Sequence, residues 1–200
     1  MEEWIDSKKL YEGQVVSLRV GHVLVDEKTV AVREVVEHPG GVAILPVLGD
    51  KIILVRQYRI AIGRQILEVA AGKLEGGEEP IERARLELEE ETGYRAKRLI
   101  PVGSVYASVG YTSEEIRLFL AFDLEKVGQR LEFDESIVTV EMPIVEIEEQ
   151  LAANKLKDAK TILCLHALLK YLRSHPEEAA SAFLHPISSF DRSDQSDPSD

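Results

Sequence analysis

The segment from Gly72 to Tyr94 carries the residues of this chain that are best suited to chemistry. It reads GKLEGGEEPIERARLELEEETGY, a glycine-containing loop followed by a run of helix-forming residues. Glu87, Glu90 and Glu91 are spaced i, i+3 and i+4, so on a helix their carboxylates project from one face. Anions this close repel one another unless a cation lies among them. The spacing therefore predicts a site for Mg²⁺, a hard cation that takes oxygen ligands and keeps water or phosphate oxygens as further partners.

The elements around this segment must hold the loop and the helix in place. Pro80 suits the first turn of a helix that we expect to run to about Thr92, and Gly93 suits the left-handed residue after it. Valine-rich runs bounded by turn residues predict strands, and apolar stretches near the end predict helices. The strands are predicted at residues 15–25, 29–38, 42–48, 51–59, 66–72, 116–124 and 136–144, and the later helices at 145–153 and 159–173. This order indicates an α+β fold or an α/β/α sandwich on a mixed sheet.

Composition and charge exclude several classes of protein. The chain has 200 residues, 44% of them hydrophobic and 30% charged, which is enough to bury a sizeable core. Its net charge of −12 disfavours binding to nucleic acid or to an anionic membrane. A single cysteine, Cys164, excludes an internal disulfide and predicts a buried thiol on the late helix. Without a signal pattern or an apolar run of membrane-spanning length, the expected location is cytoplasmic.

The segment from Gly72 to Tyr94 resembles the Nudix box, a long motif of fixed spacing. The residues that occupy positions of that pattern are Gly72, Glu78, Glu87, Leu88, Glu90, Glu91 and Gly93. The stretches REVVEHPGGVAILPV, LVRQYRIAIGRQILEVAAG and DAKT (158–161) resemble the ADP-ribose pyrophosphatase branch of that family. The likeness covers roughly residues 10 to 172.

The resemblance implies a fold and an assembly. The fold is a Nudix-type α/β/α sandwich on a mixed sheet, with a small N-terminal antiparallel β subdomain. The expected boundaries are residues 1–40 for that subdomain, 41–175 for the Nudix domain, and 176–200 for a polar, disordered tail. In this branch the N-terminal sheet often exchanges between two subunits, so a homodimer is implied.

The resemblance also implies a reaction and a set of metal ligands. The reaction is hydrolysis of the pyrophosphate bond of ADP-ribose or a related nucleoside diphosphate sugar, giving a nucleoside monophosphate and a sugar phosphate. It requires Mg²⁺, with Mn²⁺ as a substitute, and the only partner expected besides a second subunit is the small nucleotide substrate. We expect Glu87 and Glu91 to be bridging ligands, Glu90 to be the third, and the backbone carbonyl of Ala71 to reach a metal. The positions that shape the loop are Gly72, Glu78 and Gly93.

The general base is expected outside the box, in the loop of residues 131–136 before a late strand. We favour Glu135 and then Glu132, and we include Glu90 in the catalytic group; the alternative is an acidic solvated turn. Arginine forks suit phosphate, a tyrosine ring can stack on adenine, and a carboxylate can accept hydrogen bonds from a base or ribose. The predicted substrate contacts are Arg56, Tyr58, Arg59, Arg64, Glu68 and Glu115 (or its neighbour Glu114). The alternative for these residues is a charged strand edge with a core tyrosine.

Leu86 departs from the pattern, because the family has an arginine there. Arg83 lies four residues before Glu87 and is in range to replace the missing cation, whereas Arg85 is expected to point more toward Glu89. If nothing replaces the arginine, the chain is a catalytically weakened Nudix domain that binds nucleotides and regulates another protein. The loop at residues 108–110 lacks the proline common in the ADP-ribose branch, which leaves other nucleotide sugars and dinucleotides open as substrates.

Overall fold

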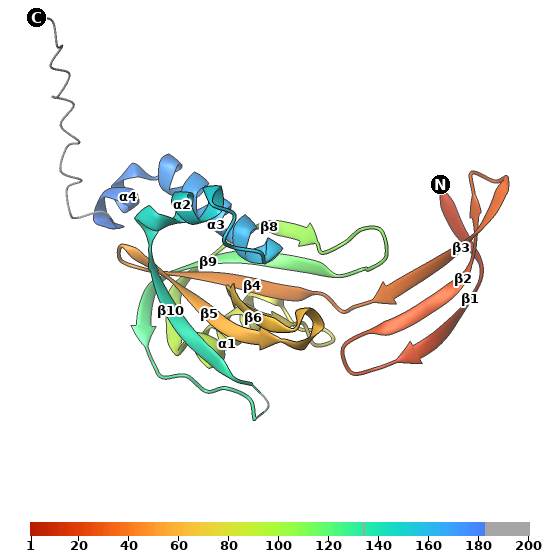
Figure 1. The fold of residues 1–200 in the computed structure, drawn as a ribbon, viewed down its shortest axis with the longest axis horizontal. Helices are drawn as coiled ribbons and strands as arrows, with labels where there is room; N and C mark the ends of the chain where they lie inside the picture. Colours follow the sequence, from red (N-terminus) through yellow and green to blue (C-terminus); the bar gives the residue numbers. More distant parts are fainter. Residues whose placement is uncertain (134, 183–200) are drawn as a thin grey trace, which may run out of the picture.

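A small sheet at the N-terminus stands apart from the main body of the chain (Figure 1). The computed structural model describes residues 1–133 and 135–182. The small sheet contains β1 (Glu2–Glu12), β2 (Ser17–Val25) and β3 (Thr29–Glu37), antiparallel and in that order. The hairpin of β2 and β3 confirms the prediction. Strand β1 was not predicted, because its charged sequence lacks apolar alternation, and all of its residues are exposed.

A seven-stranded mixed sheet forms the main body. Its order is β10-β5-β4-β9-β8, with β6 paired to β5 and β7 paired to β4. Strands β4 and β9 are parallel, with Gly41 opposite Ile116, and the other pairs are antiparallel. The bounds are β4 Gly41–Leu48, β5 Lys51–Arg59, β6 Arg64–Glu68, β7 Ala70–Lys73, β8 Tyr94–Tyr106, β9 Glu115–Lys126 and β10 Ile137–Pro143.

In the mixed sheet, the structure adds one strand to the predicted set and divides another. The single strand predicted at 66–72 is two strands, β6 and β7, which pair with different neighbours. Strand β8 was not predicted, because Pro101 and Gly103 interrupt its pattern at a register shift. Both residues fit a bulge, where a missing N–H or side chain is tolerated.

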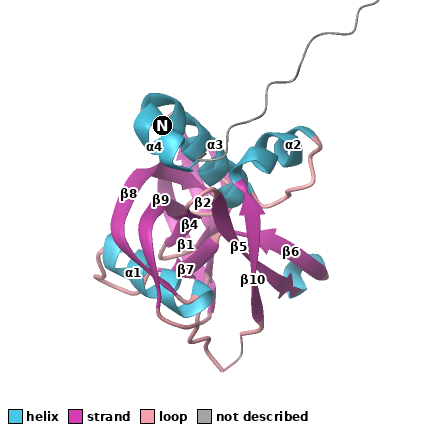
Figure 2. Ribbon diagram, turned by 90° about the vertical axis from the view of Figure 1, so that its left-hand side faces the viewer, coloured by secondary structure: helices cyan, strands magenta, loops and turns pink. Residues whose placement is uncertain are grey.

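Helices cover both faces of the mixed sheet (Figures 1 and 2). On one face lies α1 (Pro80–Glu87), and on the other lie α2 (Ile147–Ala152), α3 (Ala159–Ser174) and α4 (Pro176–Ala182). Successive residues of a strand point to opposite faces, and β4 shows this clearly. Val42 and Ile44 pack in the cluster that contains Leu88, whereas Leu45 packs in the larger cluster with Leu165. This arrangement confirms the predicted α/β/α sandwich.

The box helix changes its geometry partway. After α1, whose first residue is Pro80, the chain continues as a π-helical turn, Leu88–Thr92. Gly93 ends the turn with a φ of 75°, and a Cβ there would lie 2.7 Å from the backbone nitrogen of Gln129. Only glycine meets both demands, so the end of the turn is fixed by the sequence.

The C-terminal part carries the remaining predictions about organisation. Cys164 is a free, buried thiol on α3, as predicted. Helix α4 occupies the start of the expected tail, and residues 183–200 lie outside the described part of the chain. No helix within residues 1–133 and 135–182 is both long and apolar enough to cross a membrane.

Candidate active site

Glu87 is a buried carboxylate at the end of α1 that lies against Gly72 of β7. A Cβ atom at position 72 would lie 1.6 Å from Glu87 Oε1 and 2.0 Å from its Cδ, so residue 72 must be glycine for this side chain to fit. Arg83 Nε lies 2.8 Å from Glu87 Oε1, as its i, i+4 spacing predicts. Nε makes no hydrogen bond with any described residue, so the contact is an ion pair only.

Glu91 lies on the π-helical turn and is 4% exposed. Its Oε2 accepts a hydrogen bond from the backbone N–H of Ala71, 3.0 Å away. Burial raises the pKa of Glu87 to about 7, against the opposing charge of Arg83. Burial also raises the pKa of Glu91 to about 8, against the Ala71 N–H, and the charge of Glu87 adds to that rise. Both carboxyl groups therefore hold protons near neutral pH unless a cation replaces them.

The acidic residues fit a divalent metal ion, although they do not form a complete cage. Among residues 1–133 and 135–182, no group of three or more His, Cys, Asp or Glu side chains converges on one point suited to a metal. Mg²⁺ needs only one or two carboxylates, because it takes its other ligands from water and phosphate. Glu87 and Glu91 would supply them. Half-buried Glu90 is close enough for its charge to raise the pKa of Glu87.

The position of the missing box arginine faces solvent. Leu86 is 43% exposed on α1. The expectation that Arg85 points toward Glu89 is wrong: Arg85 Nε lies 3.7 Å from Glu82 Oε1. Glu89 instead accepts a hydrogen bond from Arg95 Nε at 2.6 Å, because β8 brings that arginine back beside the turn. Arg85 and Arg95 therefore pair with other glutamates, and on α1 it is Arg83 that contacts the buried acid Glu87.

Two other acidic residues shape the loops on either side. Glu78 Oε2 accepts a hydrogen bond from the Glu75 N–H at 3.3 Å, so within this structure it holds the glycine loop. In the later loop, Glu135 is half-buried and accepts a hydrogen bond from the N–H of exposed Glu132 at 3.1 Å. The charge of Glu135 raises the pKa of both buried acids, which puts it near them. Asp134 lies outside the described residues.

A cavity of about 390 Å³ lies beside β7. Neither Glu87 nor Glu91 lines it, but its wall includes Ala71 and Gly72, which contact Glu91 and Glu87. This size is in the range of pockets that hold small ligands. The polar side chains that line it are His38, Arg59, Lys73, Tyr106, Glu114, Asp158 and Lys160.

The predicted arginines and tyrosine of β5 and β6 divide between the cavity and the surface. Arg59 lines the cavity. Arg56 and Tyr58 are exposed, and alternation along β5 directs them to the opposite face from Arg59. Arg64 is exposed at the start of β6. Of these four residues, only Arg59 is placed beside the acid pair.

The two predicted carboxylates are already bonded to protein groups. Glu115 accepts hydrogen bonds from Ser104 Oγ, at 2.6 Å, and from Arg117. Its neighbour Glu114 lines the cavity instead. Glu68 is buried, with both of its oxygens engaged by cationic side chains.

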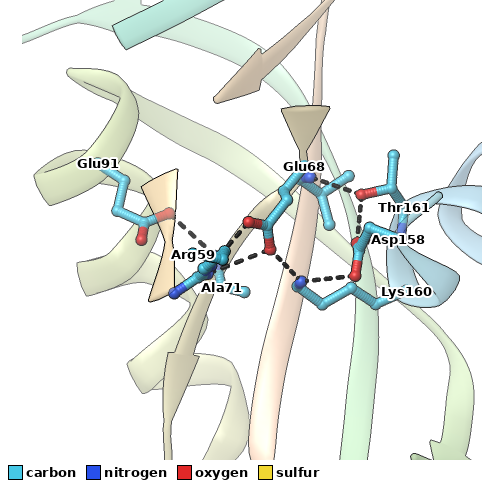
Figure 3. A network of polar contacts seen from close by, with 8 residues as sticks. Arg59, Glu68, Ala71, Glu91, Asp158, Lys160 and Thr161 are labelled. Carbon is cyan, nitrogen blue, oxygen red and sulfur yellow. Dashed lines mark hydrogen bonds and ion pairs between the residues drawn. The ribbon is translucent and has the colours of Figure 1, made fainter. Parts of the chain in front are cut away.

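Glu68 is the centre of a polar network that the sequence analysis did not anticipate (Figure 3). Arg59 binds it with Nε at 2.7 Å and Nη2 at 3.1 Å, and Lys160 Nζ lies 2.5 Å from its Oε2. Burial opposes ionisation of Glu68, but these two cations hold its pKa below the usual range. Lys160 also binds Asp158 at 2.9 Å. The DAKT stretch contained the signal, since it places two charges at the start of an apolar helix.

Comparison with known proteins gives consistent results. The family model for the NUDIX domain matches residues 37–164. An ADP-ribose pyrophosphatase of Bacillus subtilis (strain 168) is 38% identical over 170 residues, which is 84% of this chain and 92% of that protein. A methanol dehydrogenase activator of Bacillus methanolicus is 35% identical over the same length and with the same coverage. A crystal structure of an ADP compounds hydrolase matches with a TM-score of 0.78 at 20% identity, covering 87% of this chain and 95% of that one, which supports the fold.

Proposed function

This chain belongs to the Nudix family, and from that premise we propose that it hydrolyses the pyrophosphate bond of ADP-ribose or a related nucleoside diphosphate sugar. The products are a nucleoside monophosphate and a sugar phosphate. One observation carries the proposal. The buried acids Glu87 and Glu91 contact Gly72 and Ala71, and the same two residues form part of the wall of the cavity that Arg59 lines.

Each group of the site has a role in this reaction. Glu87 and Glu91 would hold Mg²⁺ or Mn²⁺, with Glu90 as a further ligand, and the ion would stabilise charge on the phosphoryl oxygens and acidify a bound water. Glu135, near both buried acids, takes the proton of the attacking water. Arg59 binds a phosphate oxygen from the cavity side. Its positive charge is needed in a chain whose net charge is −12.

The N-terminal sheet supports a homodimer. Its first strand exposes large apolar side chains that a monomer would leave in water, and it projects from the main body (Figure 1). A second copy of the chain is the occupant that the family resemblance implies for this surface. The exposed apolar residues on β1 are Trp4, Ile5, Leu10 and Tyr11. A cytoplasmic location stays a prediction from the sequence.

A second candidate function is a nucleotide-binding regulatory module. Two observations favour it: the box arginine is replaced by the exposed Leu86, and a relative with the same coverage is named a methanol dehydrogenase activator. Against it, two buried carboxylates with raised pKa values destabilise the folded state at neutral pH. A domain without metal chemistry gains nothing from keeping them.

A substrate panel tests the proposal. The protein is incubated with Mg²⁺ or Mn²⁺ and ADP-ribose, ADP-glucose, GDP-mannose, NADH or diadenosine phosphates, and phosphate is measured after phosphatase treatment. We expect turnover of ADP-ribose or another nucleotide sugar, with the two products resolved by anion-exchange chromatography. Binding of these compounds without turnover of any of them would favour the regulatory module instead.

A further inference from the structure

Lys160 belongs to a chain of alternating charges that is shielded from water except at Arg59, whose side chain is 42% exposed. The order is Arg59, Glu68, Lys160 and Asp158, and each neighbouring pair is joined by a contact of 2.5 to 2.9 Å (Figure 3). The Lys160 side chain is 13% exposed and that of Glu68 is 4% exposed. Ion pairs this buried are strong only when every member is present, because an unpaired buried charge has no water to solvate it.

The network restricts how Arg59 presents its guanidinium group. Nε and Nη2 are both held by Glu68, in a two-point contact that fixes the plane of the group. Nη1 makes no hydrogen bond within residues 1–133 and 135–182, and the residue lines the cavity. Arg59 therefore has one donor edge committed to the protein and another available to a ligand.

We propose that Lys160 is a positioning residue for substrate binding: by holding Glu68 from one side, it orients the Arg59 guanidinium toward the pyrophosphate. This inference rests on the proposed function, and it adds to it a residue outside the Nudix box. Lys160 acts through Glu68 and Arg59 and not through contact with the reacting atoms.

The start of α3 fixes the position of Lys160. Asp158 is the N-cap of this helix and accepts a hydrogen bond from the Thr161 N–H at 2.9 Å. The Thr161 hydroxyl donates to Asp158 at 2.5 Å and accepts from the N–H of Val69 at 2.8 Å. Val69 directly follows Glu68, so the helix start is bonded to the strand segment that carries the carboxylate. The ammonium group and its partner are thus held in register by the backbone.

Removing the ammonium group alters both charge and orientation. In Lys160→Met, the carboxylates of Glu68 and Asp158 both lose their ion pair with the ammonium group, and Arg59 is the one cation of the chain of charges that remains. The local charge becomes more negative by one unit beside a site that must bind a pyrophosphate. Glu68 Oε2 also loses its contact with Lys160 and keeps only the 3.1 Å bond from Arg59 Nη2, so the carboxylate that fixes the plane of the Arg59 guanidinium is no longer held from behind.

Steady-state kinetics test the proposal with a matched control. For Lys160→Met we expect the KM for ADP-ribose to rise about tenfold, the effect of one charged hydrogen bond, while kcat and the Mg²⁺ requirement change little. Lys160→Arg should restore most of the KM, since it keeps the charge and the reach. The control is Lys170→Met, on the exposed side of the same helix, which should leave KM unchanged. If Lys160→Met is not obtained folded, Lys160→Gln takes its place in the same comparison.

A double-mutant cycle with Arg59→Ala separates positioning from other roles. If Lys160 acts through Arg59, Lys160→Met should have little further effect on KM in the Arg59→Ala background. Additive effects would overturn the proposal and indicate direct contact of Lys160 with the substrate. An unchanged KM with a lowered melting temperature would also overturn it, since that result describes a purely structural lysine.

The Kd for ADP-ribose, measured by calorimetry in EDTA so that no metal supports turnover, keeps this test separate from the proposed reaction. We expect Kd to follow the same pattern as KM in the double-mutant cycle. Lys160→Met should weaken binding about tenfold when Arg59 is present and have little effect in the Arg59→Ala background. A wild-type chain that binds ADP-ribose without hydrolysing it would overturn the proposed function, and the Kd cycle would still decide the role of Lys160. Equal Kd values for wild type and Lys160→Met would refute that role.

Discussion

Replacing Gly72 by alanine should disable the site while leaving the fold intact. The added methyl group would lie 1.6 Å from Glu87 Oε1, and ordinary contacts begin near 3.4 Å. The backbone at this residue is part of the β7–β4 pairing and is not free to move. The Glu87 carboxylate, at the end of a flexible side chain, must therefore be displaced.

The displacement determines the expected loss of activity. The carboxylate oxygen must retreat by roughly 2 Å to reach ordinary contact distance. Since a misplacement of about 1 Å in a catalytic constellation can reduce the rate about 100-fold, we expect kcat to fall at least that much. The displaced oxygen is the one that Arg83 contacts, so this ion pair is disturbed as well, and higher Mg²⁺ should restore only part of the rate.

Gly76→Ala is the matched control, because it makes the same change in the same loop. A Cβ at position 76 meets no atom within 4 Å, and no positive φ demands glycine there. We expect this variant to hydrolyse the substrate at close to the wild-type rate, with both variants showing the wild-type circular dichroism spectrum. A Gly72→Ala protein that is folded and as active as Gly76→Ala would refute the role we give to the Glu87 carboxylate.

Three further predictions concern the charges of the site. Arg83→Ala should raise the pKa of Glu87 further and so weaken apparent Mg²⁺ binding about tenfold at pH 7. The difference from wild type should shrink as the pH rises. Rates measured against Mg²⁺ concentration test this prediction, with Arg85→Ala as the control. In the folded, metal-free protein Glu87 and Glu91 keep their protons up to about pH 7 to 8, whereas in the unfolded chain, with the ordinary pKa of 4.5, they lose them at lower pH. The free energy of unfolding should therefore fall as the pH rises from about 5 to 8. Urea unfolding in EDTA measures that slope, and Glu91→Gln should flatten it; a slope unaltered by the substitution would contradict the raised pKa. The double variant Glu87→Gln, Glu91→Gln should show no metal-dependent turnover in the phosphate assay, and wild-type turnover would overturn the proposed metal site.

The fold was predictable wherever a pattern of apolar residues reflects burial. Strands such as β4, buried on both faces, stand out as continuous apolar runs, and the stripe of Ala84 and Leu88 marks the inward face of the box helix. Strand β1 could not be recognised because its residues are all exposed, so pairing with β2 holds it and burial does not. The division of residues 64–73 into β6 and β7 depends on which neighbour each half pairs with, a tertiary fact absent from local sequence.

The same limit applies to the candidate site. Spacing along one helix predicted that Arg83 would be near Glu87, because both residues lie on the same element. The contact between Lys160 and Glu68 joins residues 92 positions apart, and no periodicity encodes it. On β5 we predicted substrate contacts for the neighbours Tyr58 and Arg59 alike. Because successive residues of a strand point to opposite faces, Arg59 lines the cavity and Tyr58 lies on the other face.

The π-helical turn makes the position of the second buried acid depend on the number of residues in the turn. Residues 88–92 form this wider turn directly after Glu87, and Glu91 lies within it. Deleting Glu89 would keep a glutamate pair and the flanking glycines, and it would shorten the spacing of the two buried acids from four residues to three. The wide turn would then contract to an α-helical one, so the hydrogen bond from the Ala71 N–H to Glu91 would have to form from a narrower turn. A homologue shortened by one residue here would keep glutamates on both sides of the deletion, but it would no longer match the fixed spacing of the box.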